Sequence, residues 1–240
     1  MSKSDGQTDA DSRRVGLIIP AINTVIEPEL YGARCSNVSF HFSRALLESD
    51  DENDLDSFRS DALRCAAELH AANVGTAVLA CTATSLAAGV AADDELCTQI
   101  VGVGIPAAVT TAGAIALELQ RLHVRRCAFV APYEDWLMEA AAKYYGDLGI
   151  SVVGHANIER TPREQALVTE DELRELVRRG DKRDVDAIVL SCTNMPTLGA
   201  IASLQREVGK PLVSSNAAIL QIATRGLTRR TRQAKRPQEN

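Results

Sequence analysis

An internal repeat constrains the fold of this chain more than any other feature. The segment Ala77-Val-Leu-Ala-Cys-Thr82 resembles Ile188-Val-Leu-Ser-Cys-Thr193 at an offset of 111 residues. The segment Val15-Gly-Leu-Ile-Ile-Pro20 resembles Cys127-Ala-Phe-Val-Ala-Pro132 at an offset of 112 residues. An offset this long exceeds the period of a solenoid repeat, which is about 20–50 residues. The two matches therefore indicate an internal duplication and two similar lobes.

Short β-branched runs alternate with longer stretches of helical pattern along the chain, which is typical of βαβ units. We expect strands at 15–19, 38–42, 76–80, 100–103, 127–130, 152–154, 187–191 and 211–214. We expect helices at 53–71, 85–97, 111–122, 136–148, 170–179, 197–208 and 215–227, with Glu27 and Glu29 in the first turn of another helix. Several strands are apolar on both faces, as in a parallel sheet covered by helices.

These elements predict an α/β fold of two Rossmann-like lobes with parallel sheets, related by a pseudo-two-fold axis, with the active site in the cleft between them. Residues 13–110 form the first lobe in this interpretation and residues 111–214 the second. The helix at 215–227 is a segment that can pack back on the first lobe. Residues 1–12 and the basic segment 228–240 are predicted to be mobile tails.

Composition and charge narrow the class of protein. The 240 residues carry a formal net charge of −6, so a broad basic face for nucleic acid is not expected. No apolar stretch reaches the ~18–20 residues that cross a bilayer. The N-terminus is polar and lacks the apolar core of a signal peptide. We therefore expect a soluble cytoplasmic protein with no nucleic-acid or membrane partner.

The chain has six cysteines and four histidines, and none of the cysteines forms a Cys-x-x-Cys pair. Structural zinc sites usually contain such closely spaced ligands, so no metal is expected. Without a secretory signal the cysteines are expected to be reduced thiols, most of them buried as small apolar residues.

Cys81 and Cys192 are the exceptions, because the repeat places both at the end of a strand and before a helix. A thiol near the positive end of a helix dipole tends to have a lowered pKa. If the lobes face each other, the two corners converge on one cleft and form a coupled pair, one thiolate beside one thiol. Such a pair supplies a nucleophile or base and a proton donor without a metal or organic cofactor. The alternative is that both are packing residues.

Four further residues near these strand ends are candidates for binding a carboxylate. Thr82 and Thr193 supply hydroxyls and backbone N–H groups next to the cysteines, although they can equally cap their helices. Asn23 lies at the end of the first strand, where its amide can donate to an anion or form a turn. Tyr133 lies at the matching corner of the second lobe, where its phenol can donate or its ring can pack.

These motifs together resemble a known family. The opening Arg14-Val-Gly-Leu-Ile-Ile-Pro-Ala-Ile-Asn-Thr-Val-Ile-Glu-Pro-Glu29, the Cys81-Thr and Pro132-Tyr pairs, and Ser191-Cys-Thr-Asn-Met-Pro-Thr-Leu198 are similar to maleate cis–trans isomerases. Those enzymes belong to the aspartate/glutamate racemase superfamily, together with arylmalonate decarboxylases. The resemblance covers most of the chain.

The resemblance implies a two-lobed, commonly dimeric enzyme. In maleate isomerases the cysteine matched by Cys81 adds to the alkene, and the one matched by Cys192 gives and takes the proton. The residues matched by Asn23 and Tyr133 hold the carboxylates. In the racemases the two cysteines act as opposed bases. Arylmalonate decarboxylases lack the first cysteine, so the presence of both argues against their mechanism.

The sequence departs from the maleate isomerase pattern at two places, and both bear on which substrate the protein binds. Ile22 stands where those enzymes usually have a small residue, and Cys81 is followed by Thr-Ala-Thr-Ser. The loop after the sixth strand usually carries an asparagine, whereas here it reads Arg160-Thr-Pro-Arg-Glu-Gln165. Asn157 is nearby in the sequence but precedes the position where the asparagine is expected. Arg160 and Arg163 are expected to be solvated loop residues, with contact to substrate as the alternative.

The sequence therefore predicts a cofactor-independent enzyme that isomerises a small unsaturated dicarboxylate, with maleate to fumarate as the model. A homodimer is expected from the resemblance. Three alternatives stay open: a two-cysteine amino-acid or hydantoin-type racemase, a related decarboxylase acting on a 2-substituted acid, and a non-catalytic carboxylate-binding protein.

Overall fold

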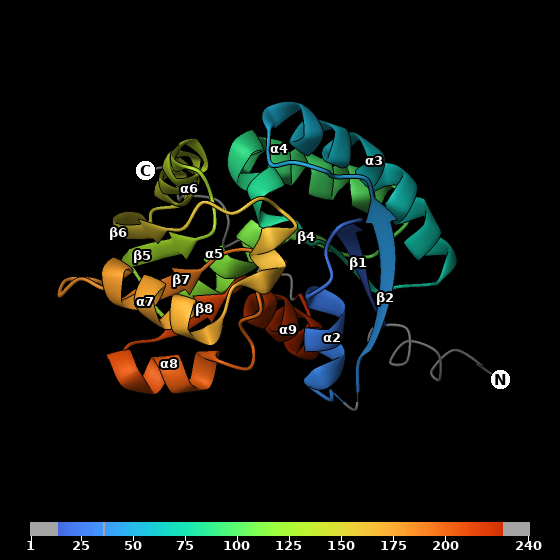
Figure 1. Ribbon diagram of the computed structural model, residues 1–240. Coiled ribbons are helices and arrows are strands. Elements are labelled where there is room, and N and C mark those ends of the chain that lie inside the picture. The colour runs from blue at the N-terminus through green and yellow to red at the C-terminus, as the bar shows by residue number, and fades with distance from the viewer. Residues whose placement is uncertain (1–13, 36, 228–240) are drawn as a thin grey trace, which may run out of the picture.

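The computed structural model describes residues 14–35 and 37–227, which form two halves with the same strand order. The first half has the parallel sheet β2-β1-β3-β4 and the second has β6-β5-β7-β8 (Figure 1). The strands of the first sheet are β1 (Arg14–Pro20), β2 (Ser39–Ala45), β3 (Thr76–Leu79) and β4 (Ala108–Thr110). Those of the second are β5 (Arg126–Ala131), β6 (Ser151–Asn157), β7 (Ala187–Leu190) and β8 (Leu212–Ser214). The predicted α/β fold of two similar parallel-sheet lobes is confirmed.

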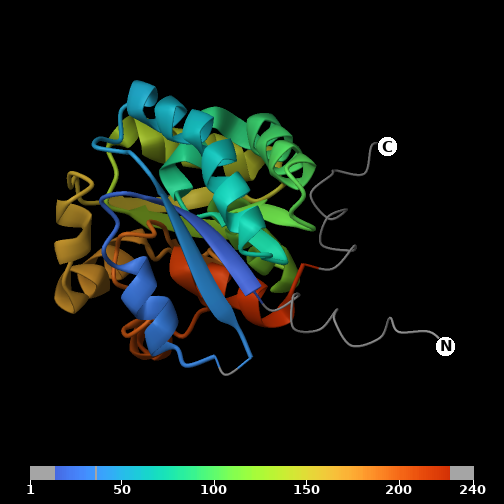
Figure 2. The ribbon, with the colours of Figure 1, turned by 90° about the vertical axis from the view of Figure 1, so that its right-hand side faces the viewer.

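Helices cover the faces of both sheets, and Figure 2 shows α3 and α4 stacked on one side of β1 and β2 while α2 lies on the other. The helices that follow the strands of the first sheet are α2 (Ile26–Gly32), α3 (Glu52–Ala71), α4 (Thr82–Gly102) and α5 (Thr111–Arg121). Those of the second are α6 (Asp135–Asp147), α7 (Glu170–Gly180), α8 (Ile201–Val208) and α9 (Ser215–Arg225), with the short 3-10 helix η1 at Glu164–Leu167. Glu27 and Glu29 lie in the first turn of α2, as predicted.

One predicted strand is wrong. Residues 100–103 belong to the end of α4 and the residue that follows it, and the fourth strand is β4. A short apolar run fits a buried helical turn as well as a strand, and here Ile100 is buried on the helix. The helix predicted at 197–208 starts only at Ile201, so Cys192 is followed by turns rather than directly by a helix.

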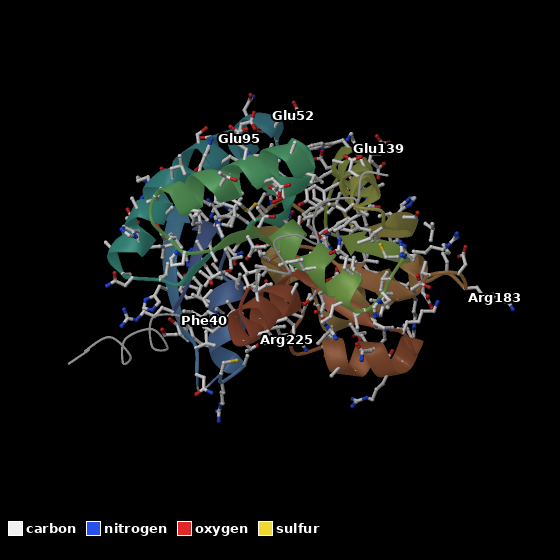
Figure 3. The ribbon with its side chains drawn as sticks, turned by 180° about the vertical axis from the view of Figure 1, so that it is seen from behind. Phe40, Glu52, Glu95, Glu139, Arg183 and Arg225 are labelled. Carbon is white, nitrogen blue, oxygen red and sulfur yellow. The ribbon has the colours of Figure 1, made fainter. Side chains whose placement is uncertain are left out.

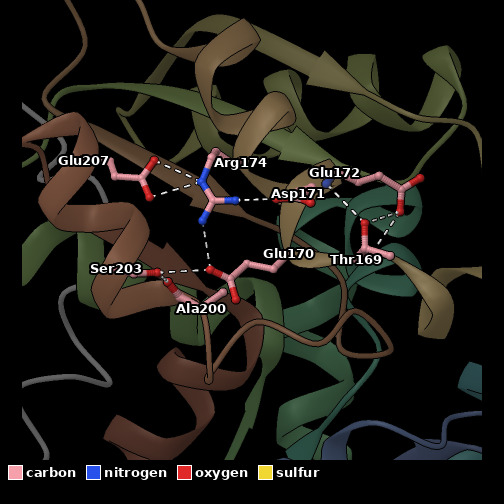
Figure 4. Close-up of polar contacts among 8 residues, drawn as sticks. All are labelled: Thr169, Glu170, Asp171, Glu172, Arg174, Ala200, Ser203 and Glu207. Carbon is pink, nitrogen blue, oxygen red and sulfur yellow. Dashed lines mark hydrogen bonds and ion pairs between the residues drawn. The ribbon is translucent and has the colours of Figure 1, made fainter.

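Local sequence signals set several helix boundaries. Thr110 and Ser214 end equivalent strands and cap the helices that follow, accepting hydrogen bonds from Gly113 and Ala217. At the start of α7, Thr169 and Glu172 form a capping box (Figure 4). The guanidinium of Arg174 reaches Glu170 and Asp171 on α7 and Glu207 on α8, joining the two helices at the surface (Figure 4).

The apolar core is continuous across both sheets, while charged side chains such as Glu52, Glu95 and Glu139 project from the outer helices (Figure 3). The helices α5 and α9, which follow the last strand of each sheet, pack against each other. α9 also contacts α2 of the first half. In the part of the chain that the structure covers, no helix is both long and apolar enough to cross a membrane. The predicted tails lie outside the described residues, and the division into lobes at residue 110 stays a prediction.

Candidate active site

The two repeated corners each place one cysteine beyond the carboxyl end of a central strand. Cys81 follows β3 and is the N-cap residue of α4, with its backbone extended. Cys192 comes two residues after β7 and has a φ of 152°, a backbone conformation that non-glycine residues seldom adopt. Both side chains are buried. The strand ends therefore present one cysteine from each half of the molecule.

Hydrogen bonds tie the two corners together. The hydroxyl of Thr193 donates to the carbonyl oxygen of Ala80 at 2.9 Å, which joins the residue after Cys192 to the residue before Cys81. The hydroxyl of Ser215, in the first turn of α9, lies 3.0 Å from the hydroxyl of Thr82. The same Ser215 oxygen accepts a hydrogen bond from the backbone N–H of Cys192 at 3.0 Å. The relative position of the cysteines is thus set by buried bonds that cross between the halves.

All six predicted site residues line one small cavity between the two halves. They are Asn23, Cys81, Thr82, Tyr133, Cys192 and Thr193. The cavity measures about 20 Å³, which is room for roughly one water molecule. A dicarboxylate therefore needs the walls to move apart before it can enter.

The two thiols differ in their hydrogen bonds. Cys81 accepts: the hydroxyl of Thr84, one turn into α4, donates to its sulfur at 3.1 Å. Cys192 donates to Oε1 of Gln165 at 3.0 Å, although its sulfur also receives hydrogen bonds from Tyr133 and the backbone N–H of Asn194. A sulfur that accepts is prepared to carry negative charge, whereas a sulfur that donates holds a proton. This asymmetry cannot be read from the near-identical Cys-Thr repeats.

The predicted lowering of the cysteine pKa is wrong for the resting structure. Burial raises the pKa of Cys81 to about 11, although the Thr84 hydroxyl and the backbone N–H groups of Ala83 and Thr84 act in the opposite direction. Burial also raises the pKa of Cys192, helped by the nearby Asp50 carboxylate. The helix N-terminus contributes as expected, but the loss of water around the sulfur is the larger effect. Both cysteines are therefore thiols at neutral pH in the closed cavity.

Asn23 and Thr193 bond to each other, because Nδ2 of Asn23 donates to the Thr193 hydroxyl at 3.0 Å. Oδ1 of Asn23 accepts from the backbone N–H groups of Val25 and Ile26, which fixes the turn into α2. Asn23 thus has the turn-forming role weighed from the sequence, while its amide lines the cavity. Carboxylate binding by Asn23, Thr82 and Thr193 stays a prediction.

Tyr133 is buried beside Cys192, and a hydrogen bond with Tyr133 acts to lower the pKa of that thiol. Burial raises the pKa of the Tyr133 phenol, so it is a neutral hydrogen-bond donor. The side-chain amide of Asn157 donates a hydrogen bond to the Tyr133 carbonyl oxygen at 2.9 Å, which helps to fix the backbone of Tyr133. Tyr133 lines the cavity, and its binding of a substrate carboxylate stays a prediction.

Two residues of the cavity wall were missed by the sequence analysis. Gln165 lies in η1, in the loop where the resemblance implies an asparagine, and its amide faces both Cys192 and Asp50. Asp50 follows β2, and Nε2 of Gln165 donates to its carboxylate at 2.7 Å across the two halves. The segment between β6 and α7 leans toward the first half at this point (Figure 1). The loop at 160–165 differs from the maleate isomerase pattern, and this difference could have pointed to Gln165. Nothing in the acidic run at 48–52 distinguishes Asp50 from its neighbours.

The loop arginines lie outside the cavity. Arg160 is exposed and pairs with Glu172 at 2.9 Å, and Arg163 is exposed as well. Both fit the solvated-loop interpretation. Within residues 14–35 and 37–227, no group of three or more His, Cys, Asp or Glu side chains is arranged to hold a metal ion.

Comparison with known proteins identifies the same family by sequence and by structure. The arylmalonate decarboxylase family model matches residues 15–236. The maleate isomerase of Alcaligenes faecalis is 30% identical over 218 residues, covering 84% of this chain and 86% of that protein.

Two solved structures extend the similarity to the fold. A cysteine-to-alanine variant of the maleate isomerase Iso from Pseudomonas putida, crystallised with maleate, superposes with a TM-score of 0.81 at 28% identity, covering 85% of this chain and 88% of that one. A liganded double variant of arylmalonate decarboxylase superposes with a TM-score of 0.83 at 27% identity, covering 89% and 92%. Global similarity alone therefore does not separate the two activities.

Proposed function

This chain belongs to the arylmalonate decarboxylase family, and we propose that within it the protein is a cis–trans isomerase of a small unsaturated dicarboxylate, with maleate as the model substrate. The two buried thiols on opposite walls of one cavity carry this proposal. Cys81 accepts a hydrogen bond from Thr84 and Cys192 donates one to Gln165. One sulfur is therefore suited to attack and the other to deliver a proton.

The reaction begins when the Cys81 thiolate donates an electron pair to one alkene carbon and forms an S–C bond. The π electrons move to the neighbouring carbon and into its carboxyl group. The Cys192 thiol gives its proton to that carbon, leaving a single bond about which the intermediate rotates. Cys192 then takes the proton back, the double bond forms again in the trans geometry, and the S–C bond breaks to release Cys81. No atoms or electrons are gained or lost.

The protein stabilises the charge that develops in these steps with fixed donors. The backbone N–H groups of Ala83 and Thr84 at the start of α4 act on the Cys81 sulfur. The Tyr133 phenol, kept neutral by burial, can donate to a carboxylate oxygen as its charge grows. Because both thiols are protonated at rest, the thiolate must form before addition, which makes turnover faster as the pH rises toward the pKa of Cys81.

The presence of both cysteines favours isomerisation over the decarboxylation named for other family members. Decarboxylation followed by a single protonation needs one proton donor, for which Cys192 suffices. A second thiol on the facing wall, with its own hydroxyl donor and helix N-terminus, has a role in addition chemistry. A two-cysteine racemase also uses both thiols, so the experiment must separate these reactions.

The test is proton NMR of the reduced protein with maleate in deuterated buffer. Growth of the fumarate signal is expected with the unaltered protein, and none with Cys81→Ala. Parallel samples contain aspartate, glutamate and a substituted malonate. Exchange of a Cα hydrogen for deuterium without isomerisation would support the racemase, and loss of a carboxylate would support the decarboxylase. Binding without any reaction would support a carboxylate-binding protein.

The cellular setting is also a proposal. A homodimer is supported by the family resemblance, and a cytoplasmic location stays a prediction from the sequence. Light scattering during gel filtration measures the mass of the assembly. A mass of one chain at micromolar concentration would contradict the dimer.

A further inference from the structure

Asp50 places a carboxylate in the wall of the candidate active site. Of the described residues that line the inner cavity, it is the one with a formally charged side chain at neutral pH. Its negative charge acts on Cys81, Cys192 and Tyr133, raising the pKa of each. A substrate that reacts with both cysteines therefore lies within the field of this carboxylate.

A larger hollow in front of the cavity is also acidic. It measures about 570 Å³ and shares Asp50 and Pro162 with the inner cavity, so it is the approach to the site. Six of the residues that line it are acidic: Asp50, Asp51, Glu52, Glu134, Glu159 and Glu164. Among its lining residues the one cation is Arg160, which is paired with Glu172. A negatively charged entrance lowers the local concentration of a dianion such as maleate.

Among residues 14–35 and 37–227, no Lys or Arg forms an ion pair with the Asp50 carboxylate. Asp50 accepts a hydrogen bond from the neutral amide of Gln165, and the nearby Glu134 adds further negative charge. Burial raises the pKa of Asp50 to about 6, with Glu134 acting in the same direction and the Gln165 hydrogen bond acting against it, so the carboxylate is ionised in most molecules at pH 8. A second substrate carboxylate placed here would face Asp50 without a counter-charge.

From the charge and donor pattern at Asp50 and Gln165 we infer that the preferred substrate carries a carboxylate at one end and an uncharged N–H donor at the other: the half-amide of a cis-enedioic acid. The inference rests on the proposed isomerase function and names its substrate class. The amide N–H groups would donate to the Asp50 carboxylate, which only accepts. The single carboxylate is left for the neutral donors of the cavity, such as Tyr133.

The preference is measured by comparing maleate with maleamate, its half-amide, at pH 8. We expect kcat/KM for maleamate to exceed that for maleate by about 10-fold or more, since a site with a partly buried acceptor discriminates against a ligand that cannot donate. Asp50→Asn removes the charge and keeps the shape, and should reduce the ratio by about 10-fold, chiefly by improving turnover of maleate. Asp56→Asn, on the exposed face of α3 outside both hollows, makes the same change in net charge and should leave the ratio unaltered.

A binding measurement keeps the inference testable if Asp50→Asn is inactive. Succinamate and succinate, the saturated analogues, cannot undergo the reaction, and their protection of Cys81 from alkylation reports affinity alone. We expect succinamate to protect at lower concentration than succinate in the unaltered protein, and this difference to shrink in Asp50→Asn. Equal protection, or a preference for maleate that Asp50→Asn leaves intact, would overturn the inference while the isomerase function stands. If neither unsaturated acid is isomerised, the proposed function itself fails and the substrate assignment fails with it.

Discussion

The hydroxyl of Thr193 donates a hydrogen bond to the carbonyl oxygen of Ala80, which joins the end of one parallel sheet to the end of the other. Each partner is a direct neighbour of a candidate catalytic cysteine in the sequence. Ser215 reinforces this connection by contacting Thr82 and the backbone of Cys192. The duplicated corners therefore act as one preorganised unit, and the predictions below concern how that unit holds and uses its two thiols.

Substitution of Cys81 should lower kcat more than substitution of Cys192. Cys81→Ala removes the nucleophile and should leave no measurable isomerisation, a loss of at least about 10³-fold in kcat. Cys192→Ser keeps a weaker proton donor and should lower kcat by about 10²–10⁴-fold, the usual contribution of a general acid or base. Initial rates of fumarate formation measure both. Cys35→Ala, far from the cavity and half-exposed, is the matched control and should keep full activity.

Thr84 should control the reactivity of Cys81. Thr84→Val removes the hydroxyl that donates to the sulfur at 3.1 Å while keeping the side-chain shape. A hydrogen bond to a charged group is worth about 1.5–3 kcal/mol, so alkylation of Cys81 at pH 8 should slow by about 10-fold or more. Thr98→Val is the control, because that exposed hydroxyl, on the same helix, bonds to the backbone of its own helix at Asp94. An equal alkylation rate in Thr84→Val and the unaltered protein would show that this bond does not stabilise the thiolate.

Asp93 should be essential for stability rather than for chemistry. Its fully buried carboxylate accepts from the hydroxyls of Thr110 and Tyr144, which joins α4 to β4 and α6, and it pairs with Arg59 at 3.4 Å. Asp93→Ala leaves these donors and the guanidinium without this partner and should lower the free energy of unfolding by about 3–5 kcal/mol. Urea denaturation measures the change. Glu95→Ala, at an exposed position on the same helix, should change the free energy of unfolding by no more than about 0.5 kcal/mol. An equally small change for Asp93→Ala would contradict the prediction.

Asp50 should make the stability of the protein dependent on pH. Its pKa rises from 3.8 to about 6 on folding, so the folded state holds this proton more tightly than the unfolded state. Below pH 3.8 the residue is protonated in both states and carries no cost. As the pH rises through 6 the folded state loses a stabilisation of at most about 3 kcal/mol, reduced to about 1–2 kcal/mol by solvent screening of a half-buried group.

The comparison that isolates this effect is Asp50→Asn against the unaltered protein. The variant should be more stable by about 1–2 kcal/mol at pH 8, with the advantage shrinking as the pH falls toward 4. Urea denaturation at pH 8, 6 and 4.5 gives the three differences, and Asp56→Asn should show no such trend. A difference that stays constant with pH would mean that Asp50 titrates as an ordinary exposed carboxyl.

The sequence predicted the architecture because its signals are local and repeated. Cys81 and Cys192 follow buried strands at equivalent positions, and parallel strands bring such corners to one edge of a sheet. The strand at 108–110 was missed because it has only three residues, while the apolar run at 100–103 matched a strand as well as a helical turn. The order of the two sheets then follows from the duplication.

The electrostatics of the site depend on contacts that the sequence does not reveal. Asp50 lies in an acidic run that resembles an ordinary solvated loop, and only the fold brings it against Gln165, 115 positions later. The pKa of Cys81 was predicted in the wrong direction because a helix N-terminus is visible in the sequence, whereas the degree of burial is not. The different roles of two near-identical Cys-Thr corners likewise come from Thr84 and Gln165.

The central claim is that Cys81 forms a covalent bond to the substrate during isomerisation. It is tested most directly by mass spectrometry of the Cys192→Ser variant, mixed with maleate at pH 8 and quenched in acid. The slow proton step in this variant should let an adduct accumulate, seen as a mass increase of one maleic acid on the peptide that contains Cys81 and absent from Cys81→Ala. Formation of fumarate by the unaltered protein without any adduct on Cys81, or an adduct confined to another cysteine, would contradict the mechanism.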